Sequence, residues 1–174
     1  MSQRKIRPIV SMVIVLVLTF GGITPAFAAP PANDSFNSAI AIGSLPFTTT
    51  QDTSEATVAG DDPTECHNNG STWYAFTPGT DMLILADTVG SDYDTTLAVY
   101  TGTQGALTLV PGACNDDFHG LQSQVEFNAT SGTTYYFLLG FCCGTGSNGG
   151  GNLVFSVYEE APPANDHFAA SETV

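Results

Sequence analysis

The pattern of apolar and polar residues predicts β-strands along most of the chain. Short runs rich in Thr, Val, Tyr and Phe alternate with clusters of Gly, Asn, Asp and Ser, and this alternation is typical of strands separated by turns. No stretch sustains a helical period, although residues 36–42 are compatible with a turn. We expect strands at residues 47–51, 72–77, 82–88, 95–101, 107–110, 123–128, 133–141 and 152–158.

About eight strands without intervening helices indicate an all-β fold, an antiparallel β-sandwich that is jelly-roll-like. In the last predicted strand, Leu153, Phe155 and Val157 alternate with a more mixed set of residues. One face of that strand should therefore be buried and the other mixed. We expect the single tryptophan, Trp73, in the core or between the sheets.

The N-terminal segment differs from the rest of the chain. A basic head is followed by an apolar run over residues 9–20 and then by Ala26-Phe27-Ala28. The run is shorter than the ~20 apolar residues that a membrane-spanning helix needs, and the A-x-A pattern fits signal peptidase cleavage after Ala28. Residues 1–28 are therefore predicted to be a signal peptide, with an uncleaved anchor as the alternative. The mature protein is expected to be secreted, soluble and extracellular.

The excess of acidic over basic residues disfavours several classes of binding partner. The chain has 3 Lys+Arg, all before residue 8, and 17 Asp+Glu, all after residue 28. Such a surface disfavours nucleic acid and, after signal cleavage, the membrane, since both attract proteins through Lys and Arg. It also lacks the arginine clamps and lysine bases of many phosphoryl-transfer and Schiff-base enzymes. Cations and neutral polymers remain as partners.

A seven-residue motif appears twice and suggests the domain organisation. The sequence Pro-Pro-Ala-Asn-Asp-Ser-Phe at 30–36 returns at 162–168 with one difference. Paired prolines suit a joint between domains, because they stiffen the chain and cannot continue a central strand. We expect one β-sandwich domain over residues 29–161 and the start of a second, incomplete repeat over 162–174. Neighbouring domains of the same polypeptide would then be partners.

The predicted export of the protein suggests that its four cysteines form disulfides, because oxidising compartments favour disulfides. We expect a disulfide between Cys66 and Cys114. Cys142 and Cys143 would then be a strained vicinal pair, free thiols, or partners of another chain, since adjacent Cα atoms lie closer than in ordinary disulfides. A zinc site built on these cysteines with His67 and His119 is an alternative, but the sequence lacks C-x-x-C spacing.

The sequence gives little support for an enzymatic function. Residues 144–149 match G-x-G-x-x-G, but the match lies between two predicted strands and no helix follows to bind a phosphate. No G-x-S-x-G sequence is present. Asp92 with Asp94, or Asp116 with Asp117, could form a glycosidase pair, although nothing in the sequence indicates a cleft or a raised pKa. We expect no catalysis.

The same acidic residues favour a cation. Asp92 and Asp94 precede one predicted strand, and Asn115, Asp116 and Asp117 follow the next. If these strands pair as a hairpin, the two loops meet at one end of the sandwich. Carboxylates converging without any Lys or Arg would repel one another unless a cation lies among them, and Ca²⁺ accepts about 6–8 oxygen ligands with flexible geometry. The alternative is that these side chains cap turns.

The motifs together resemble a known family. They are Gly90-Ser91-Asp92-Tyr93-Asp94 with the following strand, Cys114-Asn115-Asp116-Asp117, Ser131-Gly132-Thr133-Thr134-Tyr135-Tyr136, and residues 151–157. This combination looks like the bacterial pre-peptidase C-terminal domain family. The opening Pro-Ala-Asn-Asp-Ser-Phe is similar to the start of these domains when they occur in tandem in large secreted proteins.

The resemblance implies a jelly-roll-like sandwich without catalysis of its own. Such domains are associated with secretion, localisation or substrate adhesion, and related collagen-binding domains of collagenases bind calcium. In those relatives an Asn-Asp pair near the domain start helps to hold the ion, and this role carries over to Asn33 and Asp34. Their other acidic ligands precede a Tyr-x-Phe strand, where this chain has no acidic residue in positions 68–76.

We therefore expect a secreted, non-catalytic β-sandwich repeat with a structural, adhesive or localisation role, in which calcium orders the loops. Its partner would be an extracellular polymer or a cell-surface component. One alternative is a carbohydrate-binding module that uses Tyr93 or Tyr135 as a stacking platform. Another is an accessory domain of a secreted peptidase or hydrolase whose catalytic part is missing from this chain.

Overall fold

The computed structural model describes residues 29–143 and 149–160, and within them the chain is almost entirely β-structure. The described residues do not include the predicted signal peptide, the second copy of the repeated motif or most of the G-x-G-x-x-G match. The elements are η1 (Phe36–Ser38), β1 (Ile40–Ile42), β2 (Phe47–Asp52), η2 (Glu65–His67), β3 (Thr72–Phe76), β4 (Met82–Asp87), β5 (Thr95–Thr103), β6 (Ala106–Asn115), β7 (Gln124–Ala129), β8 (Tyr135–Phe141) and β9 (Asn152–Glu160).

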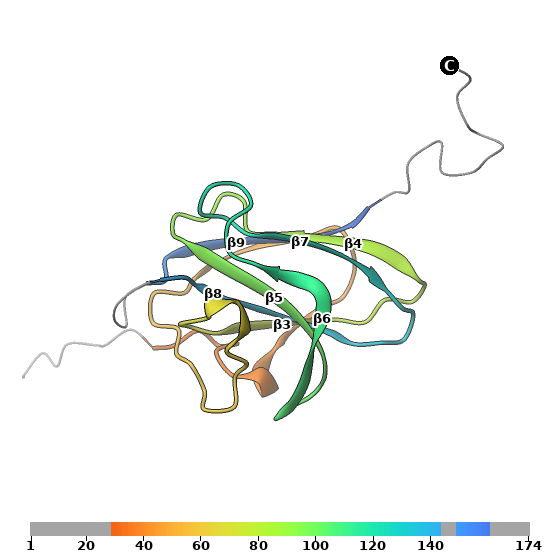
Figure 1. The fold of residues 1–174 in the computed structure, drawn as a ribbon, viewed down its shortest axis with the longest axis horizontal. Coiled ribbons are helices and arrows are strands. Elements are labelled where there is room, and N and C mark those ends of the chain that lie inside the picture. Colours follow the sequence, from red (N-terminus) through yellow and green to blue (C-terminus); the bar gives the residue numbers. More distant parts are fainter. Residues whose placement is uncertain (1–28, 144–148, 161–174) are drawn as a thin grey trace, which may run out of the picture.

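Two sheets pack face to face (Figure 1). One sheet has the strand order β1-β3-β8-β5-β6 and the other β2-β9-β4-β7. All described pairings are antiparallel except that of β1 with β3. The predicted fold class, an all-β antiparallel sandwich, is thus confirmed, and most neighbouring strands are not consecutive in the chain, as in jelly rolls.

The structure differs from the predicted strands in two places. Residues 40–42, expected in a turn, form β1, which is too short to show an alternating pattern and exists because it pairs with β3. Strand β6 runs to Asn115, beyond Pro111-Gly112, where the predicted strand ended. Strand β6 lies at the edge of its sheet, so a proline there removes no inter-strand bond that the sheet requires.

The main core lies between the sheets. Its centre consists of the large side chains with at most 1% exposure, contributed by five strands: Tyr74, Ile84, Leu97, Val99, Phe137, Leu139, Leu153, Phe155 and Val157. Leu153, Phe155 and Val157 are the residues whose alternation predicted a buried face. Aromatic rings interlock at this centre, with Phe155 4.9 Å from Tyr74 and 5.5 Å from Phe137 between ring centroids.

The opposite face of the five-stranded sheet is buried as well. Trp73, Ala98, Tyr100 and Leu138 form a second cluster there, each at most 1% exposed, which we call the outer cluster. It is covered by Phe36 of η1, whose ring meets Trp73 edge-on at 5.2 Å, and by side chains of η2, β6 and β8. Strand β5 is therefore buried on both faces, since residues 95–100 are all inaccessible. Trp73 lies in this outer cluster, not between the sheets.

The outer cluster should contribute to stability as a core does. Leu138 is fully buried, and Leu138→Ala is expected to lower the free energy of unfolding by about 2–4 kcal/mol. The matched control is Leu121→Ala, because Leu121 is 54% exposed. The control should change stability by less than about 0.5 kcal/mol. Urea denaturation monitored by Trp73 fluorescence measures both, and equal, small effects would show that the outer face is only loosely covered.

Candidate functional site

The acidic loops meet at one end of the sandwich, where three connections are joined by backbone hydrogen bonds. Thr88 N–H donates to the Ser123 carbonyl at 2.9 Å, and Cys142 N–H donates to the Asp94 carbonyl at 3.0 Å. The pairing of β5 with β6 as a hairpin places Leu97 opposite Asn115. The segment after β6 therefore runs beside the segment before β5, as the sequence led us to expect.

A buried group of hydroxyls fixes this end of the molecule. Ser123 Oγ donates to the Thr95 carbonyl at 2.7 Å, and Thr88 Oγ1 lies 2.6 Å from Thr95 Oγ1. All three side chains are fully buried. The sequence pattern does not distinguish them from other Ser and Thr residues, which are equally common in exposed turns, so only the contacts reveal their role.

Three acidic residues lie on the adjoining loops here, Asp94 before β5 and Asp116 and Asp117 after β6, and we call them the acidic cluster. Burial first, and then the charges of Asp117 and Asp116, raise the pKa of Asp94 above its usual range. Asp94 Oδ1 is buried and has no hydrogen-bond partner among the described residues. Both facts indicate that negative charge is unfavourable at this position and that a cation would relieve it.

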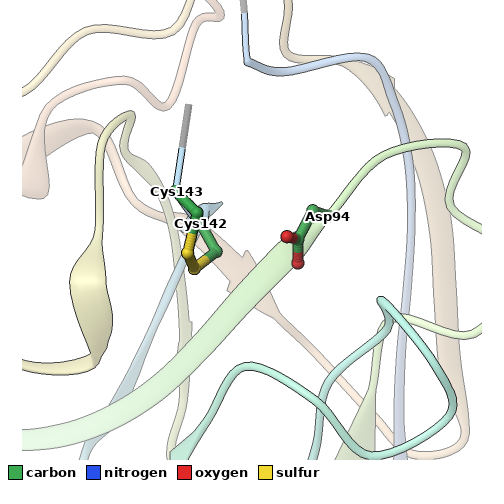
Figure 2. Close-up of side chains that lie close together, drawn as sticks. All are labelled: Asp94, Cys142 and Cys143. Carbon is green, nitrogen blue, oxygen red and sulfur yellow. A yellow bond between two sulfur atoms is a disulfide. The ribbon is translucent and has the colours of Figure 1, made fainter. Parts of the chain in front are cut away.

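The cluster adjoins a vicinal disulfide between Cys142 and Cys143 (Figure 2). One carboxylate oxygen of Asp94 and the two sulfur atoms lie within 4.8 Å of one another. Cys142 Sγ is also 3.8 Å from Asp116 Oδ2. Because disulfide sulfurs are not thiolates, the oxygens of the acidic cluster are the ligands that this site offers to a hard cation.

The second disulfide joins Cys66 to Cys114, with 5.7 Å between their Cα atoms, and this is the pairing that the sequence analysis favoured. It ties the segment between β2 and β3 to the edge strand β6. With both pairs oxidised, none of the four cysteines is a thiolate. The alternative zinc site therefore has no cysteine ligand in this structure.

Asp92 and Asn115, two other predicted ligands, have separate tasks. Asp92 Oδ1 accepts a hydrogen bond from the Asn152 N–H at 2.8 Å. Asn115 Oδ1 accepts one from the Gln124 N–H at 3.2 Å. Each thus holds the start of a neighbouring strand, which is the turn-capping role considered as the alternative. The structure places Asp94 and Asp116 next to the Cys142 sulfur and leaves the side chains of Asp92 and Asn115 bonded to the backbone.

Asn33 and Asp34 also bond to protein groups. Asn33 is fully buried, and its amide nitrogen donates to the Trp73 carbonyl at 3.0 Å, while its amide oxygen accepts from Gln51. The Asp34 carboxylate accepts from the backbone N–H of Thr57 at 2.6 Å and from the Thr57 hydroxyl. This pair therefore anchors the N-terminal segment to β3, β2 and the loop that follows β2.

The two tyrosines of the carbohydrate-binding alternative both make contacts within the protein. Tyr93 is partly buried against the main core, its hydroxyl accepts a bond from Thr53, and burial raises its pKa to about 12. Tyr135 is 5% exposed, and its hydroxyl accepts a bond from the Thr130 N–H at 2.9 Å. A stacking platform needs an exposed ring, which Tyr135 does not supply.

Comparisons with known proteins give no further guidance: no protein-family model matches the chain, and the curated proteins contain no match. The resemblance to pre-peptidase C-terminal domains remains a prediction. Within the described part of the chain, no helix has the length and apolar character to cross a membrane.

The raised pKa of Asp94 gives a pH dependence with a defined sign. The folded state binds this proton more tightly than the unfolded chain, so its contribution to stability is full below the ordinary aspartate pKa of ~3.9 and is lost as pH rises through the folded value. In chelator at pH 7, Asp94→Asn should therefore raise Tm, by about 1–2 °C, because the side chain is only partly buried and solvent screens its charge. The gain should shrink towards pH 4.

The control for this experiment is Asp52→Asn. Hydrogen bonds from the hydroxyl and the backbone N–H of Ser54 lower the pKa of Asp52, so its removal should decrease Tm at pH 7, the opposite sign. Differential scanning calorimetry across pH 4–8 measures both variants. A lower Tm for Asp94→Asn in chelator would contradict an unfavourable charge at Asp94.

The anchoring role of Asn33 is tested separately. Asn33→Ala leaves the Trp73 carbonyl and the Gln51 amide unpaired and should cost about 2–3 kcal/mol of unfolding free energy. The loss should be equal in chelator and in millimolar calcium. The control is Asn37→Ala, which removes an exposed bond to Gln104. Its expected change is below about 0.5 kcal/mol. A loss confined to calcium would instead make Asn33 a ligand.

Proposed function

We propose that the chain is a secreted, non-catalytic β-sandwich module with a structural, adhesive or localisation role, and that Ca²⁺ orders its loop end. The observation that carries the calcium part is the buried, unpartnered carboxylate oxygen of Asp94, which among the described residues lies with Asp116 and Asp117 where no Lys or Arg is available. Asp94, Asp116 and Asp117 would supply carboxylate oxygens, and water would supply others.

The non-catalytic, adhesive part of the proposal has its own support. The two disulfides fit an oxidising compartment. The loops at the acidic end also expose large apolar side chains: Val89 is 46%, Phe118 53% and Leu121 54% exposed. Exposed apolar groups on adjoining loops are typical of contact surfaces. We propose an extracellular polymer or a cell-surface component as the partner, in keeping with the resemblance to pre-peptidase C-terminal domains.

Calcium binding is tested by thermal unfolding in chelator and in millimolar calcium. A site that forms only in the folded state adds about 2.7 kcal/mol when free calcium is a hundredfold above Kd, so the wild type should melt several degrees higher in calcium. The double variant Asp94→Asn, Asp116→Asn should lose this shift, and Glu159→Gln, at an exposed position of β9, should keep it. An unchanged wild-type Tm would rule out a stabilising site, and a shift that survives the double variant would place it elsewhere.

A further inference from the structure

The first copy of the repeated motif, residues 30–36, is bound to the sandwich through a buried asparagine. Asn33 is 0% exposed, and its amide nitrogen donates to the Trp73 carbonyl at 3.0 Å. In return, the Asn33 backbone carbonyl accepts from the Trp73 N–H at 2.9 Å. Its amide oxygen accepts from the side chain of Gln51. The motif is thus attached to both β3 and β2.

Two further residues complete this attachment. The Asp34 carboxylate accepts from the backbone N–H and the hydroxyl of Thr57. The ring of Phe36 meets that of Trp73 edge-on at 5.2 Å and lies 4.6 Å from that of Tyr136, between centroids. We call Asn33, Asp34 and Phe36 the docking residues. The groups that they contact form the docking site, on Gln51, Thr57, Trp73 and Tyr136.

The second copy of the motif, residues 162–168, repeats all three docking residues. Positions 165, 166 and 168 are again Asn, Asp and Phe. The one difference is His167, which stands where the first copy has Ser35. The Ser35 side chain is exposed and forms no capping hydrogen bond. The second copy therefore carries every side chain that the docking site contacts and differs at a position that faces solvent.

The docking site of its own domain is both occupied and distant for the second copy. The first copy fills it, and β9 leads the chain away from it. Gln51 of the docking site pairs with Leu153, and β9 continues from there to Glu160, about 23 Å further on. From Glu160 to Asn165 a fully extended chain spans at most about 18 Å, and it would also have to reverse direction. The second copy is therefore better placed to meet another sandwich.

We propose that residues 162–168 dock on a second copy of this chain, where they replace residues 30–36. Because both copies of the motif carry the same docking residues, the exchange gives up none of their contacts and costs mainly the entropy of association. Each chain offers a docking site near the start of β9 and a motif beyond its end, so the association is head to tail. This inference rests on the structural role proposed above but not on calcium, and measurements in chelator keep the two apart.

The first experiment measures whether the sequence of the second copy fits the docking site. Ser35→His gives residues 30–36 the sequence of residues 162–168, and its Tm in the full chain should lie within about 2 °C of the wild type. Asp34→Ala, at the neighbouring docking residue, should lower Tm by several degrees because Thr57 loses its acceptor. A loss in Ser35→His as large as that in Asp34→Ala would overturn the proposal.

The second experiment follows the exchange in the full chain by analytical ultracentrifugation. Residues 30–36 compete from within their own chain at an effective concentration in the millimolar range, so the wild type at micromolar concentration should be a monomer. Asn33→Ala weakens the first copy, and the average mass should then rise with concentration between about 10 µM and 1 mM. The double variant Asn33→Ala, Asn165→Ala should remain a monomer. A monomeric Asn33→Ala, or association that survives in the double variant, would overturn the proposal.

A peptide measures docking without association of whole chains. The acetylated and amidated peptide of residues 162–168 should raise the Tm of the double variant in a saturable way, whereas the same peptide with Ala for its Asn should not. If Asn33→Ala is unfolded at the working temperature, Asp34→Ala with Asp166→Ala takes its place, since Asp34 is only partly buried. Equal shifts with both peptides, or no shift with either, would overturn the proposal.

Discussion

The absence of Lys and Arg beyond residue 7 is the constraint on which the rest of the structure depends. Among the described residues no carboxylate can pair with either residue type, so hydroxyl groups, backbone N–H groups and water take the place of ion pairs. Several carboxylates accept hydrogen bonds from such groups. Asp34 accepts from Thr57, Asp62 from Ser71 and from the Ala59 N–H, and Asp81 from the Ser131 N–H. These bonds fasten the loops, so the acidic residues organise the molecule through hydroxyl and backbone N–H groups.

The acidic cluster departs from this arrangement. It lies at the open end of the β5–β6 pair, where Asp94 precedes β5 and Asp116 follows β6. Burial and like charges disfavour ionisation at Asp94, and its buried carboxylate oxygen has no hydrogen-bond partner in the described part of the chain. This end of the molecule would therefore gain from a positive charge supplied from outside the chain.

Local pattern was sufficient to predict most strands, because alternation and turn residues act within a few positions. It could not predict the outer cluster. Trp73 and Leu138 alternate with inward-facing Tyr74 and Leu139, so both faces of these strands are apolar and periodicity does not tell which face meets the other sheet. Strand β1 was missed for a related reason, since so short a segment carries no period and owes its conformation to β3.

The site residues were predictable where strand pairing alone places them. Asp94 and Asp116 meet because β5 and β6 form a hairpin, which the sequence suggests. Asn33 and Asp34 were expected to be ligands only because of the resemblance to calcium-binding relatives. Their donors in this structure, Gln51 and Thr57, lie in later segments of the chain and give no local signal.

Glu65 was not singled out because it lies in the irregular segment between β2 and β3, which has no periodicity to extrapolate. Its place over the outer face of the five-stranded sheet follows from the neighbouring disulfide, which fixes Cys66 against β6 at Cys114. The sequence favoured this cysteine pairing, but it did not show which residues the pairing brings together. Tyr100 and Leu107 reach the same face of the sheet only through the β5–β6 register. A covalent bond that the sequence favours thus fixes an irregular segment on the sheet, and the side chains that this segment covers follow only from the fold.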